Sequence, residues 1–360
     1  MAFNPDMLKI ARESRKLTQK ELADKLIISQ VLISKIEAGI YNVSEDILSS
    51  LSKILDYPTT FFENDCYALD MGIRLHRKRS TLTKKEESYI DSIASINNIC
   101  ISKILNFVDI DINIPEILVD DYKTPEDIAI DIRYLWDIPK GCIKNLTAIL
   151  EKAGIFISEV DENPRKFDAV SFYNKKYGFG VIIINKNQPA DRYRFTLAHE
   201  LGHLIMHRNT ISATKEQEAN RFAANLLMPA EEIADDLKNL QFWNLPTLKQ
   251  IWRVSMAALI VRAHDLALID DKKYTSLNVR LSQMRYRQNE PTMNIEKEDP
   301  SLFKDIVLYF FRELNYSEKE LLQLLSINQD DFYNSFYIET RNHIRSNKKL
   351  AVVDFTKKNK

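Results

Sequence analysis

Apolar residues recur every three or four positions along most of this chain, which is the spacing of amphipathic helices. Capping residues give several of these segments defined starts: Thr18 in a capping box, Ser29, and Ser44. Thr124 followed by Pro125 opens a further helix. The pattern therefore predicts a largely helical chain, with its clearest helices over residues 18–26, 29–38, 44–55, 83–107 and 301–314.

One segment departs from the helical spacing. Residues 180–185 form a β-branched run, Gly-Val-Ile-Ile-Ile-Asn, with turn-like flanks, which predicts a strand. A continuous apolar run is typical of a strand that is buried on both faces. The alternative is a strand along a cleft, where a substrate peptide could add as a further strand. We favour the buried strand.

The segment Ala198-His199-Glu200-Leu201-Gly202-His203 carries the most specific chemistry. Two imidazoles four residues apart on one helix face can grip a single Zn²⁺, and the Glu between them can act on the metal-bound water. The chain has only 6 His, so this pairing is an improbable accident. His207 lies about 12 Å along the helix from His199, too far to share the ion. We predict a metallopeptidase-type site on His199, Glu200 and His203.

Catalytic zinc usually takes three protein ligands, so a third is needed. Apolar residues at helical spacing predict a second helix over residues 216–228 that packs one face inward. On it, Glu216 lies roughly 50° from the mean apolar direction and Glu218 roughly 110° away. We predict Glu216 as the third ligand, with Glu218 as the fallback. Asn220, one turn after Glu216, could hydrogen-bond a ligating His and fix its ring.

These two blocks, Arg194 to His203 and the later Glu-x-x-Ala-Asn-x-Phe-Ala-Ala-x-Leu-Leu-Met-Pro, resemble the ImmA/IrrE metallopeptidase family. The resemblance implies a zincin-like fold and a gluzincin-like ligand set, carried onto His199, His203 and Glu216, with Glu200 as general base. The implied reaction is zinc-dependent hydrolysis of peptide bonds. Asn220 stands where some relatives have Asp, and a neutral amide accepts a His N–H less strongly than a carboxylate does.

A second resemblance covers residues 4–63, which are similar to the Cro/repressor-like (XRE) helix-turn-helix family. Relatives often have Gly in the turn where Ile27 stands, so this turn is expected either to avoid positive φ or to be strained. The likeness is carried by Leu17-Thr18-Gln19, Glu21-Leu22-Ala23, Ile33, Ser34, Ile36, Glu37 and Gly39.

The resemblance implies that the helix over residues 29–38 enters a DNA major groove, with Gln30, Val31 and Ser34 nearest the base edges. Gln30 could pair with adenine, whereas Gln19 and Lys35 would more naturally hold phosphates. Paired half-sites further imply a homodimer on double-stranded DNA. We favour DNA over protein contacts because the motif comes with basic Arg12, Arg15, Lys16, Lys20, Lys25 and Lys35.

Composition changes this picture little. Lys and Arg number 50 against 51 Asp and Glu, a net charge of -1, so attraction to DNA has to come from local clustering. No secretory leader or membrane-spanning apolar run is evident, so a cytoplasmic protein without membrane contact is expected. At 360 residues the chain exceeds what one core usually holds, which favours several domains.

The changes of pattern divide the chain into four expected parts. These are a helix-turn-helix domain over 1–66, a helical linker over 67–123, a zincin-like α+β peptidase domain over 124–291, and a C-terminal helical module with a frayed tail over 292–360. The expected fold class is multidomain and mainly α, with a small central sheet. The expected function is a DNA-binding transcriptional regulator with a zinc metallo-endopeptidase that cleaves a regulatory protein such as a repressor. The alternatives are a ligand-sensing regulator whose zincin domain does not hydrolyse, and an antitoxin-like DNA-binding module with a protein partner.

Overall fold

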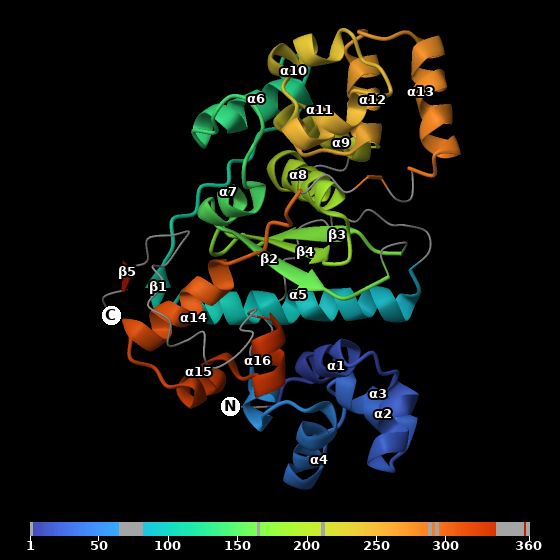
Figure 1. Cartoon of the computed structure of the whole chain (residues 1–360). Coiled ribbons are helices and arrows are strands. Elements are labelled where there is room, and N and C mark those ends of the chain that lie inside the picture. Colours follow the sequence, from blue (N-terminus) through green and yellow to red (C-terminus); the bar gives the residue numbers. More distant parts are fainter. Residues whose placement is uncertain are drawn as a thin grey trace.

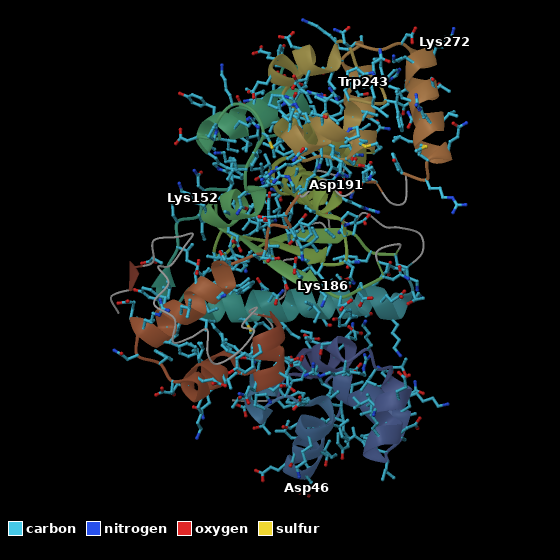
Figure 2. The ribbon with its side chains drawn as sticks, in the orientation of Figure 1. Asp46, Lys152, Lys186, Asp191, Trp243 and Lys272 are labelled. Carbon is cyan, nitrogen blue, oxygen red and sulfur yellow. The ribbon has the colours of Figure 1, made fainter. Side chains whose placement is uncertain are left out.

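The computed structural model describes residues 3–64, 82–163, 166–209, 213–286, 290–291, 295–335 and 356–357. A three-stranded sheet lies near the middle, with helices on both of its faces (Figure 1). Asp46 on α4 (Glu45–Leu55) and Lys272 on α13 (Asp271–Gln283) lie near opposite ends of the molecule (Figure 2).

The N-terminal part is a bundle of short helices: α1 (Pro5–Ser14), α2 (Gln19–Leu26), α3 (Gln30–Glu37), α4 and the 3₁₀ helix η1 (Thr59–Glu63). The predicted capping box at Thr18 and the predicted caps Ser29 and Ser44 are all present, because each side chain accepts a backbone N–H of the first turn. Of the two turn geometries expected between α2 and α3, the structure has the strained one. Ile27 has φ 57°, which is unfavourable for a β-branched residue.

The helix predicted as part of a linker is packed on two sides. α5 (Lys84–Ile104) starts at a capping box on Thr83 and lies between α1 and the sheet (Figure 1). Its buried Ile90, Ala94 and Ile101 belong to one hydrophobic core that also contains side chains of the N-terminal bundle and of the sheet. The bundle and the central domain therefore share a core. Residues 67–81 of the predicted linker lie outside the described residues.

The sheet has the strand order β2-β4-β3, formed by β2 (Ile155–Val160), β4 (Gly180–Asn185) and β3 (Ala169–Tyr173). β4 is parallel to β2 and antiparallel to β3. All six residues of β4 are buried, so the favoured prediction of a core strand is confirmed. The alternative of strand addition along β4 is wrong, because both edges of this strand are already paired.

A second core fills the other face of the sheet, where α8 (Ala190–Met206) runs next to β3 and β4. Successive residues of a strand point to opposite faces, so Ile182 and Ile184 of β4 pack on this side while Val181 and Ile183 face α5. The other helices of this part are α6 (Pro125–Leu135), α7 (Leu146–Lys152), α9 (Lys215–Leu227), α10 (Ala230–Leu237), α11 (Leu245–Trp252), α12 (Met256–Asp265) and α13.

The C-terminal part contains α14 (Leu302–Arg312), α15 (Glu318–Leu325) and α16 (Gln329–Ser335). The start of α14 is fixed by Glu151, whose carboxylate accepts the backbone N–H groups of Ser301 and Leu302 at 3.0 and 2.9 Å. The tail is not frayed where it is described, because β5 (Thr356–Lys357) pairs antiparallel with β1 (Val108–Asp109).

The expected fold class is confirmed: the chain is mainly helical, with N-terminal helices, a small mixed sheet in the centre and C-terminal helices. Within the described ranges, no helix combines the length and the apolar character that crossing a bilayer requires.

Candidate metal centre and nucleic-acid interface

His199 and His203 lie one turn apart on the buried helix α8. The apolar neighbours Leu197, Leu201 and Leu204 hold this helix in the second core, so both imidazoles are almost completely shielded from solvent. Their Nε2 atoms lie 3.1 Å apart and point toward a common centre. The spacing that was recognised in the sequence therefore places two nitrogen donors side by side.

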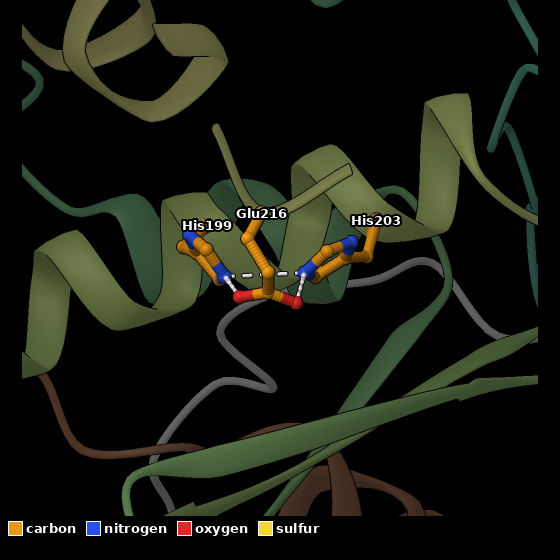
Figure 3. A group of neighbouring side chains, drawn as sticks. All are labelled: His199, His203 and Glu216. Atoms are coloured by element: carbon orange, nitrogen blue, oxygen red, sulfur yellow. Dashed lines mark hydrogen bonds and ion pairs between the residues drawn. The ribbon is translucent and has the colours of Figure 1, made fainter. Parts of the chain in front are cut away.

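Glu216 in the first turn of α9 closes the group (Figure 3). Its Oε2 lies 3.5 Å from His199 Nε2, and its Oε1 lies 3.4 Å from His203 Nε2. These three side chains could hold a metal ion, since one donor atom of each lies within 4.8 Å of the others. Glu216 is the residue that was favoured from the direction of its helix face.

The donor set fits a small divalent cation. Metal–donor distances of about 2.0–2.1 Å in a tetrahedral site separate the donors by about 3.3 Å, close to the three spacings observed here. Oε1 of Glu216 is buried and, within the described part of the chain, makes no hydrogen bond. This is expected of a carboxylate oxygen that serves as a metal ligand. Burial lowers the pKa of His203 to about 4, so its ring is neutral and keeps a lone pair for a metal.

Asn220 orients His199. Its Oδ1 lies 3.0 Å from His199 Nδ1, which is the hydrogen bond that the helical spacing predicted. Because an amide oxygen can only accept, the ring proton lies on Nδ1 and the Nε2 lone pair is directed at the centre of the group.

Glu200 has a partner that sequence reasoning missed. Ser171 of β3 is fully buried, and its Oγ donates to Glu200 Oε2 at 2.7 Å. Ser171 lies on the same face of β3 as Ala169, which belongs to the core around α8. The alternation of residues along a strand predicts that Ser171 and Ala169 share a face. The sequence does not show that β3 lies next to α8.

Glu218, the fallback ligand, lies outside this group. Its Oε2 lies 2.7 Å from His207 Nε2, and Thr214 Oγ1 donates to its Oε1 at 2.5 Å. His207 ends α8 and is likewise outside the group, in agreement with the prediction that it is too far along the helix to share the ion. Both residues are nevertheless linked to His203: His207 contacts it directly, and Glu218 contacts His207.

Gly202 lets α8 and α9 approach closely. A Cβ at this position would lie 3.0 Å from Phe222 Cδ1 and 3.3 Å from Ala219 Cα. Gly202→Ala should therefore push the two helices apart and lower the free energy of unfolding by about 1–3 kcal/mol. Thermal unfolding measures this change, and the sign of the change in unfolding free energy distinguishes the two outcomes. Without the clash, Ala in place of Gly inside a helix would stabilise the protein.

The helix-turn-helix presents four of the five predicted contact residues to solvent. Gln30, Val31, Ser34 and Lys35 of α3 are all exposed, and Val31 is 62% exposed despite its apolar side chain. Gln19 at the start of α2 is half-buried, and its amide nitrogen donates to Glu37 at 2.8 Å.

Three of the six basic residues that were taken as support for DNA binding form ion pairs with acidic residues of the same chain. Arg12 is buried and paired with Glu37 at 2.6 Å. Arg15 makes a bidentate pair with Asp331, and Lys16 pairs with Glu162 at 2.5 Å. Of these six residues, Lys20, Lys25 and Lys35 are exposed and take no part in these three ion pairs, so less basic charge is left on the helix-turn-helix than the sequence suggested.

Comparison with protein families gives two matches. Residues 150–264 match the IrrE N-terminal-like domain of the M78 peptidases, and residues 8–62 match a helix-turn-helix domain. The chain therefore combines a helix-turn-helix domain, a class of domain that binds DNA, with an M78 peptidase-like domain that contains the His199, His203 and Glu216 group. Both resemblances drawn from the sequence are confirmed. A comparison with curated proteins found no match.

Proposed function

We propose that this protein is a DNA-binding transcriptional regulator whose peptidase-like domain hydrolyses peptide bonds with the help of a bound zinc ion. The observation that carries the proposal is the convergence of His199, His203 and Glu216 from two helices, with Glu200 adjacent to His199 on the same buried helix. Two nitrogens and one carboxylate oxygen form the protein ligand set of many catalytic zinc sites.

Zinc, when bound, lowers the pKa of a coordinated water and polarises the scissile carbonyl. Glu200 would accept the proton of the attacking water and deliver it to the leaving amine. Ser171 holds one oxygen of that carboxylate at 2.7 Å, which limits the rotation of the carboxylate. The near-complete burial of Glu200 keeps bulk water away from this proton transfer.

The substrate would be an extended segment of a regulatory protein, such as a repressor. β3 is the strand that supports this choice, because it lies at one end of the strand order and carries Ser171 against Glu200. A peptide that adds to β3 would pass close to the catalytic carboxylate and would use main-chain hydrogen bonds for affinity.

Metal analysis tests the proposal. The purified protein should contain one zinc per chain, and Glu216→Gln should lose it because one of the three donors is weakened. Glu231→Gln is the matched control, since this exposed acid in the first turn of α10 lies outside the group. Elemental analysis after dialysis measures both variants. Retention of zinc by Glu216→Gln, with loss in Glu218→Gln, would reverse the ligand assignment.

The DNA-binding part would act as a homodimer that places α3 of each copy in the major groove of a paired half-site. Binding to a promoter duplex should weaken steeply as salt rises, because Lys contacts to phosphate release counterions. Lys35→Ala should reduce the slope of log K against log salt by about one. Lys238→Ala, directly after the end of α10, is the control and should leave the slope unchanged. Salt-independent binding would contradict the proposal.

A further inference from the structure

A third histidine, at the C-terminal cap of α8, lies behind the candidate metal centre. His207 is almost completely buried, and its Nδ1 lies 3.0 Å from Nδ1 of His203. Its other nitrogen, Nε2, lies 2.7 Å from Glu218 Oε2. Three groups from two helices therefore form an unbroken chain of contacts that starts at His203.

The position of the metal centre fixes the protons along this chain. To bind a metal, His203 must direct its Nε2 lone pair at the centre that His199 and Glu216 also face, so its own ring proton lies on Nδ1. His207 must then accept at Nδ1 and carry its proton on Nε2, where it donates to the carboxylate of Glu218. Only this arrangement satisfies both short contacts with neutral rings and an ionised Glu218.

The two candidate ligands are therefore supported differently. His199 donates to Asn220, whose amide is neutral, whereas the chain from His203 ends at the carboxylate of Glu218. A negative charge at the end of such a chain makes the ligating nitrogen a stronger donor and holds its ring in place. Glu218 is itself held by Thr214, which donates to its other oxygen at 2.5 Å.

We propose that His207 and Glu218 are positioning residues that fix the tautomer of His203. Through His207, the negative charge of Glu218 strengthens His203 as a ligand, whereas Asn220 is neutral and gives His199 no such charge. The inference rests on the proposed metal centre. It assigns a role to the acid that sequence analysis kept only as a fallback ligand, and to a histidine that does not bind the metal.

Zinc affinity, measured by competition with a chromophoric chelator, tests this role without any substrate. Glu218→Gln keeps an oxygen that can accept from His207 but removes the charge, and it should weaken zinc binding about tenfold at unchanged stoichiometry. Glu231→Gln is the matched control. Like Glu218 in α9, Glu231 is an acid in the first turn of its helix, α10. Glu231 is exposed and lies outside the candidate metal centre, so this variant should bind zinc as the parent protein does.

A compensating variant separates charge support from simple packing. Adding Asn220→Asp to Glu218→Gln places the negative charge behind His199 instead, and it should recover most of the lost affinity. Unchanged zinc affinity in Glu218→Gln would overturn the positioning role of His207 and Glu218, and so would a double variant that binds zinc as weakly as Glu218→Gln alone. In either case, one zinc per chain in the parent protein would still support the proposed function. A parent protein that binds no zinc would instead overturn the proposed function.

Discussion

Glu200→Gln is expected to lower the rate of peptide cleavage by about 10²–10⁴-fold while the protein keeps its zinc. Glutamine has nearly the same shape as glutamate and can still accept the hydrogen bond from Ser171, but it cannot take up the proton of an attacking water. Cleavage of candidate repressors encoded beside this gene, followed by gel electrophoresis, measures the loss. Elemental analysis of the same samples shows whether the metal remains.

Ser171→Ala provides a companion to this experiment. It leaves Glu200 ionisable but removes the hydroxyl that holds it, so the maximal rate should fall by less than in Glu200→Gln, and Ser171→Thr should restore part of it. Cleavage by Glu200→Gln at the parent rate would exclude the proposed mechanism. Normal promoter regulation by Glu200→Gln would favour the ligand-sensing alternative, in which the peptidase-like domain does not hydrolyse.

Glu298→Ala is expected to lower the free energy of unfolding by about 3–5 kcal/mol. The carboxylate of Glu298 pairs with Arg194 of α8, and both side chains are buried. Glu298 also accepts the backbone N–H of Thr147 at 3.0 Å, at the start of α7. Its removal would leave the guanidinium in a buried site, where desolvation already lowers the pKa of Arg194 to about 10.

Urea unfolding followed by tryptophan fluorescence measures this change. Asp235→Ala is the matched control, because Asp235 also pairs with a cation, Lys238, but on the exposed surface of α10. Such a pair is screened by water, so its loss should leave the unfolding midpoint where it is. A Glu298→Ala protein as stable as this control would show that the charge of Arg194 is compensated by other groups.

The helices and the two imidazoles could be predicted because their signals are local. A helix repeats every 3.6 residues, so residues four apart, such as His199 and His203, share a face wherever the helix lies. Glu216 and Asn220 followed from the same geometry, because the apolar stripe of α9 indicates which side points inward. The caps Thr18, Ser29 and Ser44 act within a single turn.

The misjudged features depend on partners that are distant in the chain. Arg15 and Lys16 were counted among the basic residues that favour DNA binding, but they pair with Asp331 and Glu162, which lie far along the sequence. The strand at residues 180–185 was correctly expected to be buried, yet its place between β2 and β3 depends on how all three strands assemble.

By itself, the sequence determined the positions of the clearest helices, the turn of α8 that carries two nitrogen donors, and the inward face of α9. These properties follow from spacing along a single helix. Only the tertiary structure decided that Ser171 holds Glu200, that Glu218 supports His203 through His207, and that α5 joins the N-terminal bundle to the sheet in one core. The physical reason is that a hydrogen bond or a buried contact needs atoms within a few ångströms, and spacing along the chain does not determine which distant segments come that close.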